Sequence, residues 1–417
     1  MTRRGYLEVA VIAGLLAAAC TGARETELDD KNVNQLSEPT EPGDPGASAD
    51  GDQPLASDQD PGNPGKGSSG SSSGGSSNPT GGCNFKDDKD HDGDGLSWKD
   101  GDCNDCDANV RPGMIDEPGN GKDEDCSGKA DDDSSCDGAG ALSLASSDAM
   151  DAARALGACK SATASKPGWG VLSATYVKPD GTPLSHALSY GILPSFGTNQ
   201  PQAGKAMVAL STGAARAPGQ VEYAATIDKG YSHGTPQGWP KSSPACTGTN
   251  DVTPTVAKDG AALKLEIKVP IDAHSMSFEH ALFTKDYSSD VCSKFTDQFV
   301  VIMSPAPSGA LDGNIVFDAQ GGAINVNSPL LQACTPGTYK DVTYACGLGT
   351  SLLTGTGFEG KGSTGWLRTT TPVDPGSTIT LLFAVWDSGD GTYDSTVLLD
   401  SLRFWTKSVT KTQTVAK

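Results

Sequence analysis

Aspartates with the spacing of a calcium-binding loop occupy one short stretch of this 417-residue chain. Asp88, Asp90 and Asp92 alternate with other residues and are followed by Gly93, which matches positions 1, 3, 5 and 6 of an EF-hand loop. Calcium takes about six to eight oxygen ligands, and closely spaced carboxylates separated by glycine let a loop wrap around one ion. The pattern therefore indicates a site for a hard divalent cation.

The EF-hand itself is excluded by the end of the loop. Position 12 requires a bidentate glutamate, whereas this chain has Lys99 there, and no helical pattern flanks the stretch. Asp100 and Asp102 lie just beyond and can supply late carboxylates to a different wrapping of the ion.

Two other interpretations of the stretch stay open. An acidic loop can be no more than a solvated face. The second interpretation is a zinc or copper site at Cys103, Asn104 and Cys106. Against it, His91 is the only histidine near these residues in the sequence, and no second pair of ligands has the spacing of a zinc site. The many oxygen donors favour calcium (Ca²⁺).

Negative charge is concentrated around the same stretch. Residues 83–136 contain 17 Asp and Glu against 6 Lys and Arg, a net charge of -11 within a total of -21. Charge of this density repels phosphate backbones and attracts divalent cations. We therefore expect calcium ions as partners and no nucleic acid.

The first 20 residues have the features of an export signal. Arg3 and Arg4 precede the apolar run 9–19, which is too short to span a bilayer, and small residues lead to Cys20. The run resembles a bacterial lipobox, with Leu16 one position earlier than usual, and this resemblance implies lipidation of Cys20; ordinary secretory cleavage is the alternative. We expect an exported bacterial protein, lipid-anchored to the membrane at the outer membrane or cell surface.

Ten further cysteines are divided equally by Gly138, so either one disulfide joins the two halves or each half keeps a free thiol. Cys136 and Cys159 are the candidate joining pair because they are close in sequence. Cys334 and Cys346 flank a short turn-rich segment and are the candidate local pair.

Residues 141–410 are predicted to form a β-sandwich with an opening helix. Asp148 and Asp151 offer caps to an alanine-rich run that Gly157 ends. Apolar and charged residues alternate over 263–271, as in a half-buried antiparallel strand. Further strands are expected at 275–283 (with Met276, Phe278, His280 and Leu282 on one face), 298–304 and 314–317, and central strands, apolar on both faces, at 377–387 and 395–405.

The chain is thus predicted to be mainly β and to have four parts. These are a lipoprotein signal peptide (1–20), a disordered linker rich in Pro, Gly, Ser and Asp (21–82), an acidic module that is small, loop-rich and disulfide-bonded (83–137), and the sandwich (141–410).

The acidic module resembles the metal-binding motif of exported bacterial proteins and is similar to the calcium-wrapped thrombospondin type 3 repeat. The resemblance rests on "DHDGDG", "DCNDCD", "VRPG" and "DEDCSGKAD", and it implies a Cys103–Cys126 disulfide; Cys106 replaces the usual Asp or Asn. The predicted metal ligands are Asp88, Asp90, Asp92, Asp94, Asp100, Asp102, Asp105, Asp107, Asp123, Asp125 and Asp131.

The downstream region resembles the choice-of-anchor L domain over most of residues 145–405. The similarity rests on "LSTG" near the start, on Phe295, Asp297 and Phe299, and on the closing "WDSGDGTYDSTVLLD". It implies display at the cell surface and no particular chemistry.

A second metal site is a hypothesis for the closing motif, at Asp387, Asp390 and Asp394, with Asp286 and Asp297 approaching from elsewhere. The alternative is an ordinary Asp-Gly hairpin turn. A surface glycan or protein ligand would bind at such end loops.

"GYSHG" at 230–234 matches the nucleophile elbow of hydrolases, which requires a helix after it and a parallel sheet. Here "TPQGWPKSSP" follows, and the surroundings are all-β, so we expect no enzyme. The expected function is a calcium-binding surface lipoprotein for adhesion or envelope structure. The alternatives are a carbohydrate-binding protein and a hydrolase that uses Ser232 with His274 or His280.

Overall fold

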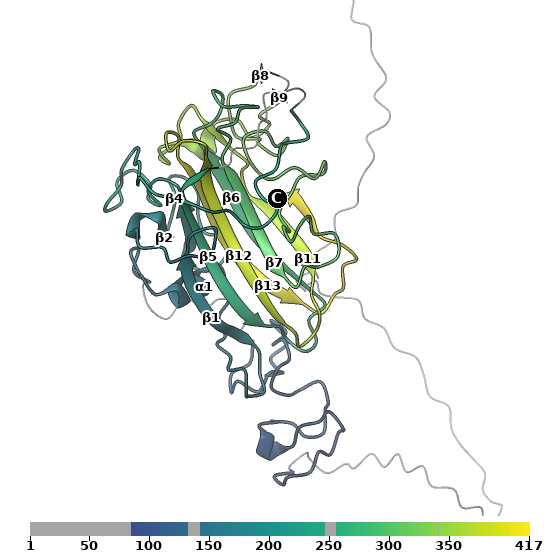
Figure 1. Cartoon of the computed structure of the whole chain (residues 1–417). Coiled ribbons are helices and arrows are strands. Elements are labelled where there is room, and N and C mark those ends of the chain that lie inside the picture. Colours follow the sequence, from purple (N-terminus) through teal and green to yellow (C-terminus); the bar gives the residue numbers. More distant parts are fainter. Residues whose placement is uncertain (1–84, 132–141, 247–255, 341) are drawn as a thin grey trace, which may run out of the picture. The chain divides into compact units, whose positions relative to one another are not determined.

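The computed structural model describes residues 85–131, 142–246, 256–340 and 342–417, and the structural statements below concern these ranges (Figure 1). The predictions for the signal peptide, Cys20, the linker and Cys136 fall outside them. Within these ranges, no helix has the length and apolar character needed to cross a bilayer.

Two antiparallel sheets form the sandwich, as the sequence predicts. The first has the order β1 (Gly170–Val177), β5 (Ala257–Lys268), β12 (Thr378–Ser388), β7 (Gln298–Ser304), and the short β4 (Ser232–His233) also pairs with β5. The second has the order β14 (Gln413–Ala416), β11 (Leu367–Pro372), β6 (Ser275–Thr284), β13 (Ser395–Trp405), β3 (Met207–Ser211), β2 (Tyr190–Leu193), with β10 (Gly362–Ser363) paired to β6. A separate hairpin joins β8 (Gly337–Tyr339) and β9 (Val342–Tyr344).

The main core lies between the sheets. Phe383 of β12 and Phe278 of β6 are fully buried and meet edge to face, with ring centroids 5.3 Å apart. The predicted alternation is confirmed in β5, where Leu263 and Leu265 are buried and Lys264 is exposed. Burial of each such apolar side chain contributes about 1.5–3 kcal/mol, which holds the two layers together.

Two strand predictions need correction. The predicted inward face of β6 is buried, but its other face is buried too, because Ala281 and Phe283 pack in a second cluster with Phe196 and Phe358. Residues 314–317 form isolated bridges instead of a strand, since Asn314 pairs singly with Ile302 and Leu311.

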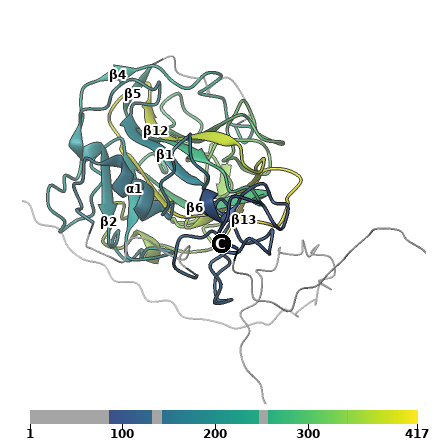
Figure 2. The same cartoon turned by 90° about the horizontal axis from the view of Figure 1, so that it is seen from below.

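The opening helix α1 (Ala149–Leu156) begins and ends as predicted. The Asp148 carboxylate accepts the Met150 N–H at 2.9 Å, and Gly157 ends the helix with φ +107°. A Cβ at Gly157 would lie 3.0 Å from the Leu402 carbonyl oxygen, so glycine allows the helix end to reach β13. The helix packs beside β1, β2 and β3 (Figure 1, Figure 2).

The described ranges also contain three short 3₁₀ helices, η1 (Trp98–Asp100), η3 (Ala187–Ser189) and η4 (Ser351–Leu353).

Disulfides confirm two predicted pairs, Cys103–Cys126 and Cys334–Cys346. A third, Cys246–Cys292, was not predicted, because 46 residues separate its cysteines. Cys106 and Cys159 are also disulfide-bonded. Every cysteine within the described ranges is therefore oxidised, which agrees with an exported protein.

The acidic module contacts the sandwich through main-chain hydrogen bonds around residues 113–115. The Ile271 N–H donates to the Gly113 carbonyl at 2.9 Å, and the Trp169 indole N–H donates to the Met114 carbonyl at 2.6 Å. Ile115 packs against the main core. Ile271, predicted to continue the strand, instead lies beyond β5 at this contact.

Candidate metal centre

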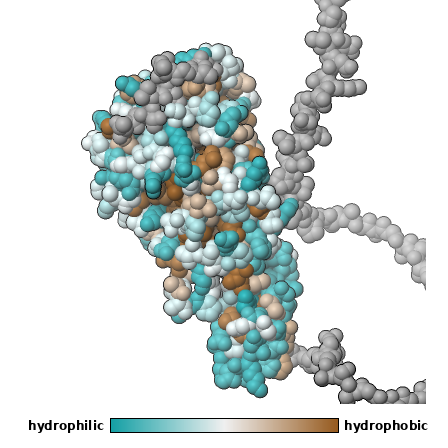
Figure 3. Space-filling model, turned by 45° about the vertical axis from the view of Figure 1, so that its right-hand side comes forward, coloured by the Kyte–Doolittle hydropathy of each residue, from teal (hydrophilic) through white to brown (hydrophobic). Residues whose placement is uncertain are grey.

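The aspartates of the acidic module first shape its loops. Within residues 85–131 the only helix or strand is η1, and side chains take the place of regular secondary structure. Asp90 accepts the N–H groups of Gly93 at 2.6 Å and Gly95 at 2.9 Å, and both glycines have positive φ. Hydrophilic side chains cover most of the visible surface of this segment (Figure 3). The loops therefore turn their carboxylates toward one another without an apolar core.

A first carboxylate cluster forms where two of these loops meet. It contains two overlapping triads, each with ligand oxygens within 4.8 Å of one another. Asp92 belongs to both triads. The members of the first carboxylate cluster are Asp90, Asp92, Asp94, Asp102 and Asp105.

Several oxygens of this cluster are buried without a hydrogen bond. One carboxylate oxygen of each of Asp92, Asp94, Asp102 and Asp105 has no partner, and Asp102 and Asp105 are only 1% and 2% exposed. The nearest cation within the described residues, the Arg111 Nε, is 3.6 Å from Asp94 Oδ2. A buried carboxylate without a partner is costly, so the donor set suits a hard cation that accepts several oxygens.

The pKa values differ between the buried and the exposed carboxyl groups of this cluster. Burial, and then the charges of neighbouring carboxylates, raise the pKa of Asp92 and of Asp102. The N–H groups of Gly95 and Gly93 lower the pKa of the exposed Asp90. The raised pKa values of Asp92 and Asp102 disfavour their charged forms, and a cation bound between them would lower these pKa values.

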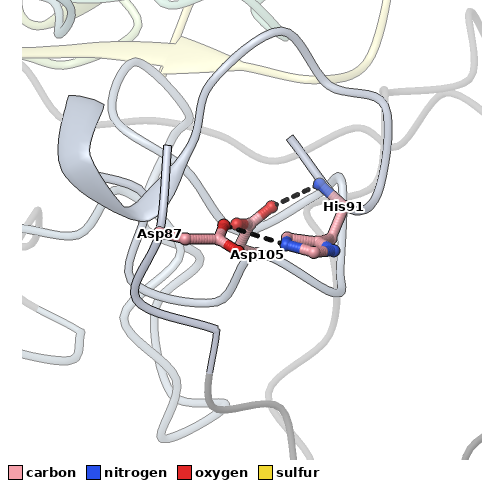
Figure 4. Close-up of side chains that lie close together, drawn as sticks. All are labelled: Asp87, His91 and Asp105. Atoms are coloured by element: carbon pink, nitrogen blue, oxygen red, sulfur yellow. Dashed lines mark hydrogen bonds and ion pairs between the residues drawn. The ribbon is translucent and has the colours of Figure 1, made fainter. Parts of the chain in front are cut away.

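His91 connects this cluster to a further carboxylate that the sequence prediction missed. Its main-chain N–H donates to Asp105 at 2.7 Å, and its ring Nε2 lies 3.0 Å from Asp87 (Figure 4). Phe85 stacks on the His91 ring. Asp87, His91 and Asp105 form a third triad within 4.8 Å. No local pattern in the sequence marks this pair, because residues 87–91 form no helix that would bring positions four residues apart together.

A second carboxylate cluster contains Asp116, Asp123 and Asp125, whose ligand oxygens also lie within 4.8 Å of one another. Asp116 is fully buried and accepts the Glu124 N–H at 3.1 Å. Asp125 forms an ion pair with Lys160 of the sandwich. Asp116 was not predicted, because it lies outside the repeating pattern of aspartate and glycine.

Four predicted ligands join none of these groups in the described residues. Asp88 is exposed, 3.5 Å from the Lys99 ammonium group. The other three support turns: Asp100 accepts from Ser97, Asp107 accepts from Asn109, and Asp131 accepts the N–H groups of residues 119–121.

The zinc or copper alternative loses its sulfur ligands. Cys103 is bonded to Cys126, and Cys106 is also in a disulfide, so neither is a thiolate.

In the sandwich, Asp387 and Asp394 are buried, while Asp390 is half-buried and accepts the Thr392 N–H at 3.3 Å. These three acids are not one of the triads within 4.8 Å in the described residues. Asp297 does approach the residue after Asp394, because its carboxylate accepts from the Ser395 hydroxyl at 2.7 Å.

Asp286 lies next to Asp297, whose N–H donates to its carboxylate at 2.8 Å. Burial raises the pKa of Asp286, Asp297 and Asp387 well above the usual range of a carboxyl group.

The hydrolase motif has a different setting from a nucleophile elbow. Ser232 lies exposed in β4, which pairs antiparallel with β5, and no helix follows it in residues 234–246. His280 is fully buried, with its Nε2 3.0 Å from the Thr369 hydroxyl and its ring near Phe278 and Phe299. His280 is thus a packed strand residue.

Comparison with models of protein families matches residues 189–404 to the choice-of-anchor L domain. No curated protein matches the chain. The matched region extends from β2 almost to the end of β13 and does not include the acidic module.

Proposed function

This chain belongs to the choice-of-anchor L domain family, which associates it with the cell surface, and we propose that it is a displayed protein whose acidic module binds calcium. The observation that carries the proposal is the first carboxylate cluster. Four buried carboxylate oxygens there have no hydrogen bond and converge from two loops. A calcium ion bound to them would offset two of their four negative charges and hold the loops together.

The donor set favours calcium over other common metals. The candidate ligands are oxygens, and the nearby sulfur atoms are in disulfides, which disfavours zinc and copper. Magnesium requires a compact octahedral shell and keeps much of its water, whereas irregular sets of carboxylates suit calcium. The Cys103–Cys126 disulfide pins the loop of Asp102 and Asp105 beside that of Asp123 and Asp125.

Calcium stabilises the folded acidic module, and the sandwich has a role in adhesion or in the structure of the cell envelope. A lipid on Cys20 anchors the chain to the outer membrane or cell surface, and the segment 21–82 separates the anchor from the folded part. The support for this arrangement is the export signal together with the family of the sandwich.

The metal part is tested by calorimetric titration of the mature chain with calcium and, in parallel, with magnesium. We expect calcium to bind with a dissociation constant of about 10⁻⁴ to 10⁻³ M, as in extracellular calcium modules, and magnesium to bind more weakly. An absence of heat at millimolar calcium would refute calcium binding.

The anchor is tested by labelling cells with a radioactive fatty acid. Label is expected on the wild-type chain and not on Cys20→Ala; label on both would count against the anchor. Binding of the mature chain to a glycan array would instead favour a carbohydrate-binding function.

A further inference from the structure

Two buried carboxylates of the sandwich have oxygens without a hydrogen bond. Asp387 is the penultimate residue of β12 and Asp394 directly precedes β13, and they are 1% and 3% exposed. Neither oxygen of Asp387 makes a hydrogen bond of normal geometry, and Oδ1 of Asp394 makes none. The Thr212 hydroxyl is near enough to Asp387 to favour its charged form, but it donates toward the Ser395 carbonyl at 3.4 Å.

Three segments far apart in the sequence enclose this place. The Ser395 N–H donates to the Thr212 hydroxyl at 2.9 Å, and the Ser395 hydroxyl donates to Asp297 at 2.7 Å. Asp297 in turn donates its N–H to Asp286. These residues therefore form a hydrogen-bonded network around Asp387, whose two carboxylate oxygens make no hydrogen bond.

The backbone also makes room for the second carboxylate. A Cβ at Gly213 would lie 2.4 Å from the carboxyl carbon of Asp394. Any larger residue at position 213 would displace that carboxylate. Glycine thus lets Asp394 lie directly against the loop that carries Thr212.

Buried carboxyl groups outnumber the ammonium groups that lie near them. Lys285 pairs with Asp394 Oδ2 at 2.6 Å, but Lys229 donates to the Ser189 hydroxyl and the Ser211 carbonyl instead of to a carboxylate. Against these two ammonium groups stand the carboxyl groups of Asp259, Asp286, Asp297, Asp387 and Asp394. The Lys229 ammonium group favours the charged form of Asp387 but makes no hydrogen bond to it. A buried charge without a hydrogen-bonded partner is disfavoured, so a further cation or a proton must compensate Asp387.

We propose that a divalent cation binds between Asp387 and Asp394, with the Thr212 hydroxyl as a neutral ligand. The all-oxygen donors make calcium the ion of choice. The site keeps two acids of the sequence hypothesis and leaves out Asp390, which is half-buried and bonded within its own turn. It is independent of the acidic module and of the function proposed for it.

The test compares wild type with Asp387→Asn in the full mature chain, by ion counting and by thermal unfolding in calcium and in EDTA. Asp387→Asn should lose one bound ion per chain. It should unfold at a higher temperature than wild type in EDTA, where a buried charge is removed, and at a lower temperature in calcium, where a ligand is removed.

Asp390→Asn is the matched control and should keep the ion. Asp102→Asn weakens the ion of the acidic module, so the double variant Asp102→Asn/Asp387→Asn should bind one ion fewer than Asp102→Asn alone. Failure of this site and failure of the module are therefore distinguishable. An unchanged ion count in Asp387→Asn, with the same shift in unfolding temperature in both buffers, would show that a proton compensates Asp387 and would overturn the proposal.

If Asp387→Asn does not fold, crystals of the wild-type chain grown with terbium give the second test. An anomalous scattering peak between Asp387 and Asp394 is expected. Its absence, in crystals where the ion is seen at the acidic module, would equally overturn the proposal.

Discussion

Replacement of Asp102 by Asn tests the first carboxylate cluster most sharply. The Asp102 side chain is 1% exposed, and its ligand oxygen lies within 4.8 Å of those of Asp92 and Asp105. Two unit charges at that distance repel by roughly 1 kcal/mol in water and roughly 3.5 kcal/mol at an effective dielectric constant of about 20. Removing one charge relieves two such repulsions, so the calcium-free protein should gain at least about 2 kcal/mol where the acids are ionised.

The same substitution removes attraction for a cation. We expect calcium affinity to fall at least about tenfold, because a charged ligand becomes a neutral one. Calorimetric titration measures the affinity. Urea unfolding in EDTA and in calcium measures the two stabilities, whose difference should be smaller in Asp102→Asn than in wild type.

Asp107→Asn is the matched control, since Asp107 is an acid of the same module that bonds to Asn109 and joins no triad. Its calcium affinity should stay within about threefold of wild type. The reasoning is refuted if Asp102→Asn binds calcium as wild type does, or if Asp107→Asn weakens binding equally.

Three further predictions concern the sandwich. Burial raises the pKa of Asp400 to about 7, above its unfolded value of about 4. The contribution of this group to the free energy of unfolding should therefore be fully present below pH 4 and fall as pH rises to 7. Urea unfolding at pH 5 and at pH 8 should give two free energies whose difference is smaller in Asp400→Asn than in wild type. Removal of the Cys334–Cys346 disulfide by the double Ser variant should cost about 3 kcal/mol, from the loop closed by cysteines 12 residues apart, measured by denaturant unfolding without reductant. Phe383→Ala should lower the free energy of unfolding by about 3–5 kcal/mol, because it removes the ring that packs on Phe278 between the sheets. Calcium affinity measured by titration should not change, and a loss of affinity in this variant would contradict a metal site separate from the core.

Features that depend on neighbours in the chain were predictable from the sequence. The caps of α1 depend on residues within one turn, so Asp148 and Gly157 give its bounds directly. Alternation in β5 follows from the two-residue period of a strand. Cys334 and Cys346 are close because a short hairpin joins them.

Features that depend on contacts through space were decided by the tertiary structure. Asp116 joins Asp123 and Asp125 because the chain folds back on itself, and no local pattern marks it. Burial of the second face of β6 depends on Phe358, far along the chain. Asp387 is unpartnered because packing removes water from it, whereas the sequence alone equally allows an exposed turn. Residue types and their spacing along the chain thus determine the helix, the strands and the number of carboxylates. The distances between carboxylates and their burial, on which ion binding depends, arise only when segments distant in the sequence pack together.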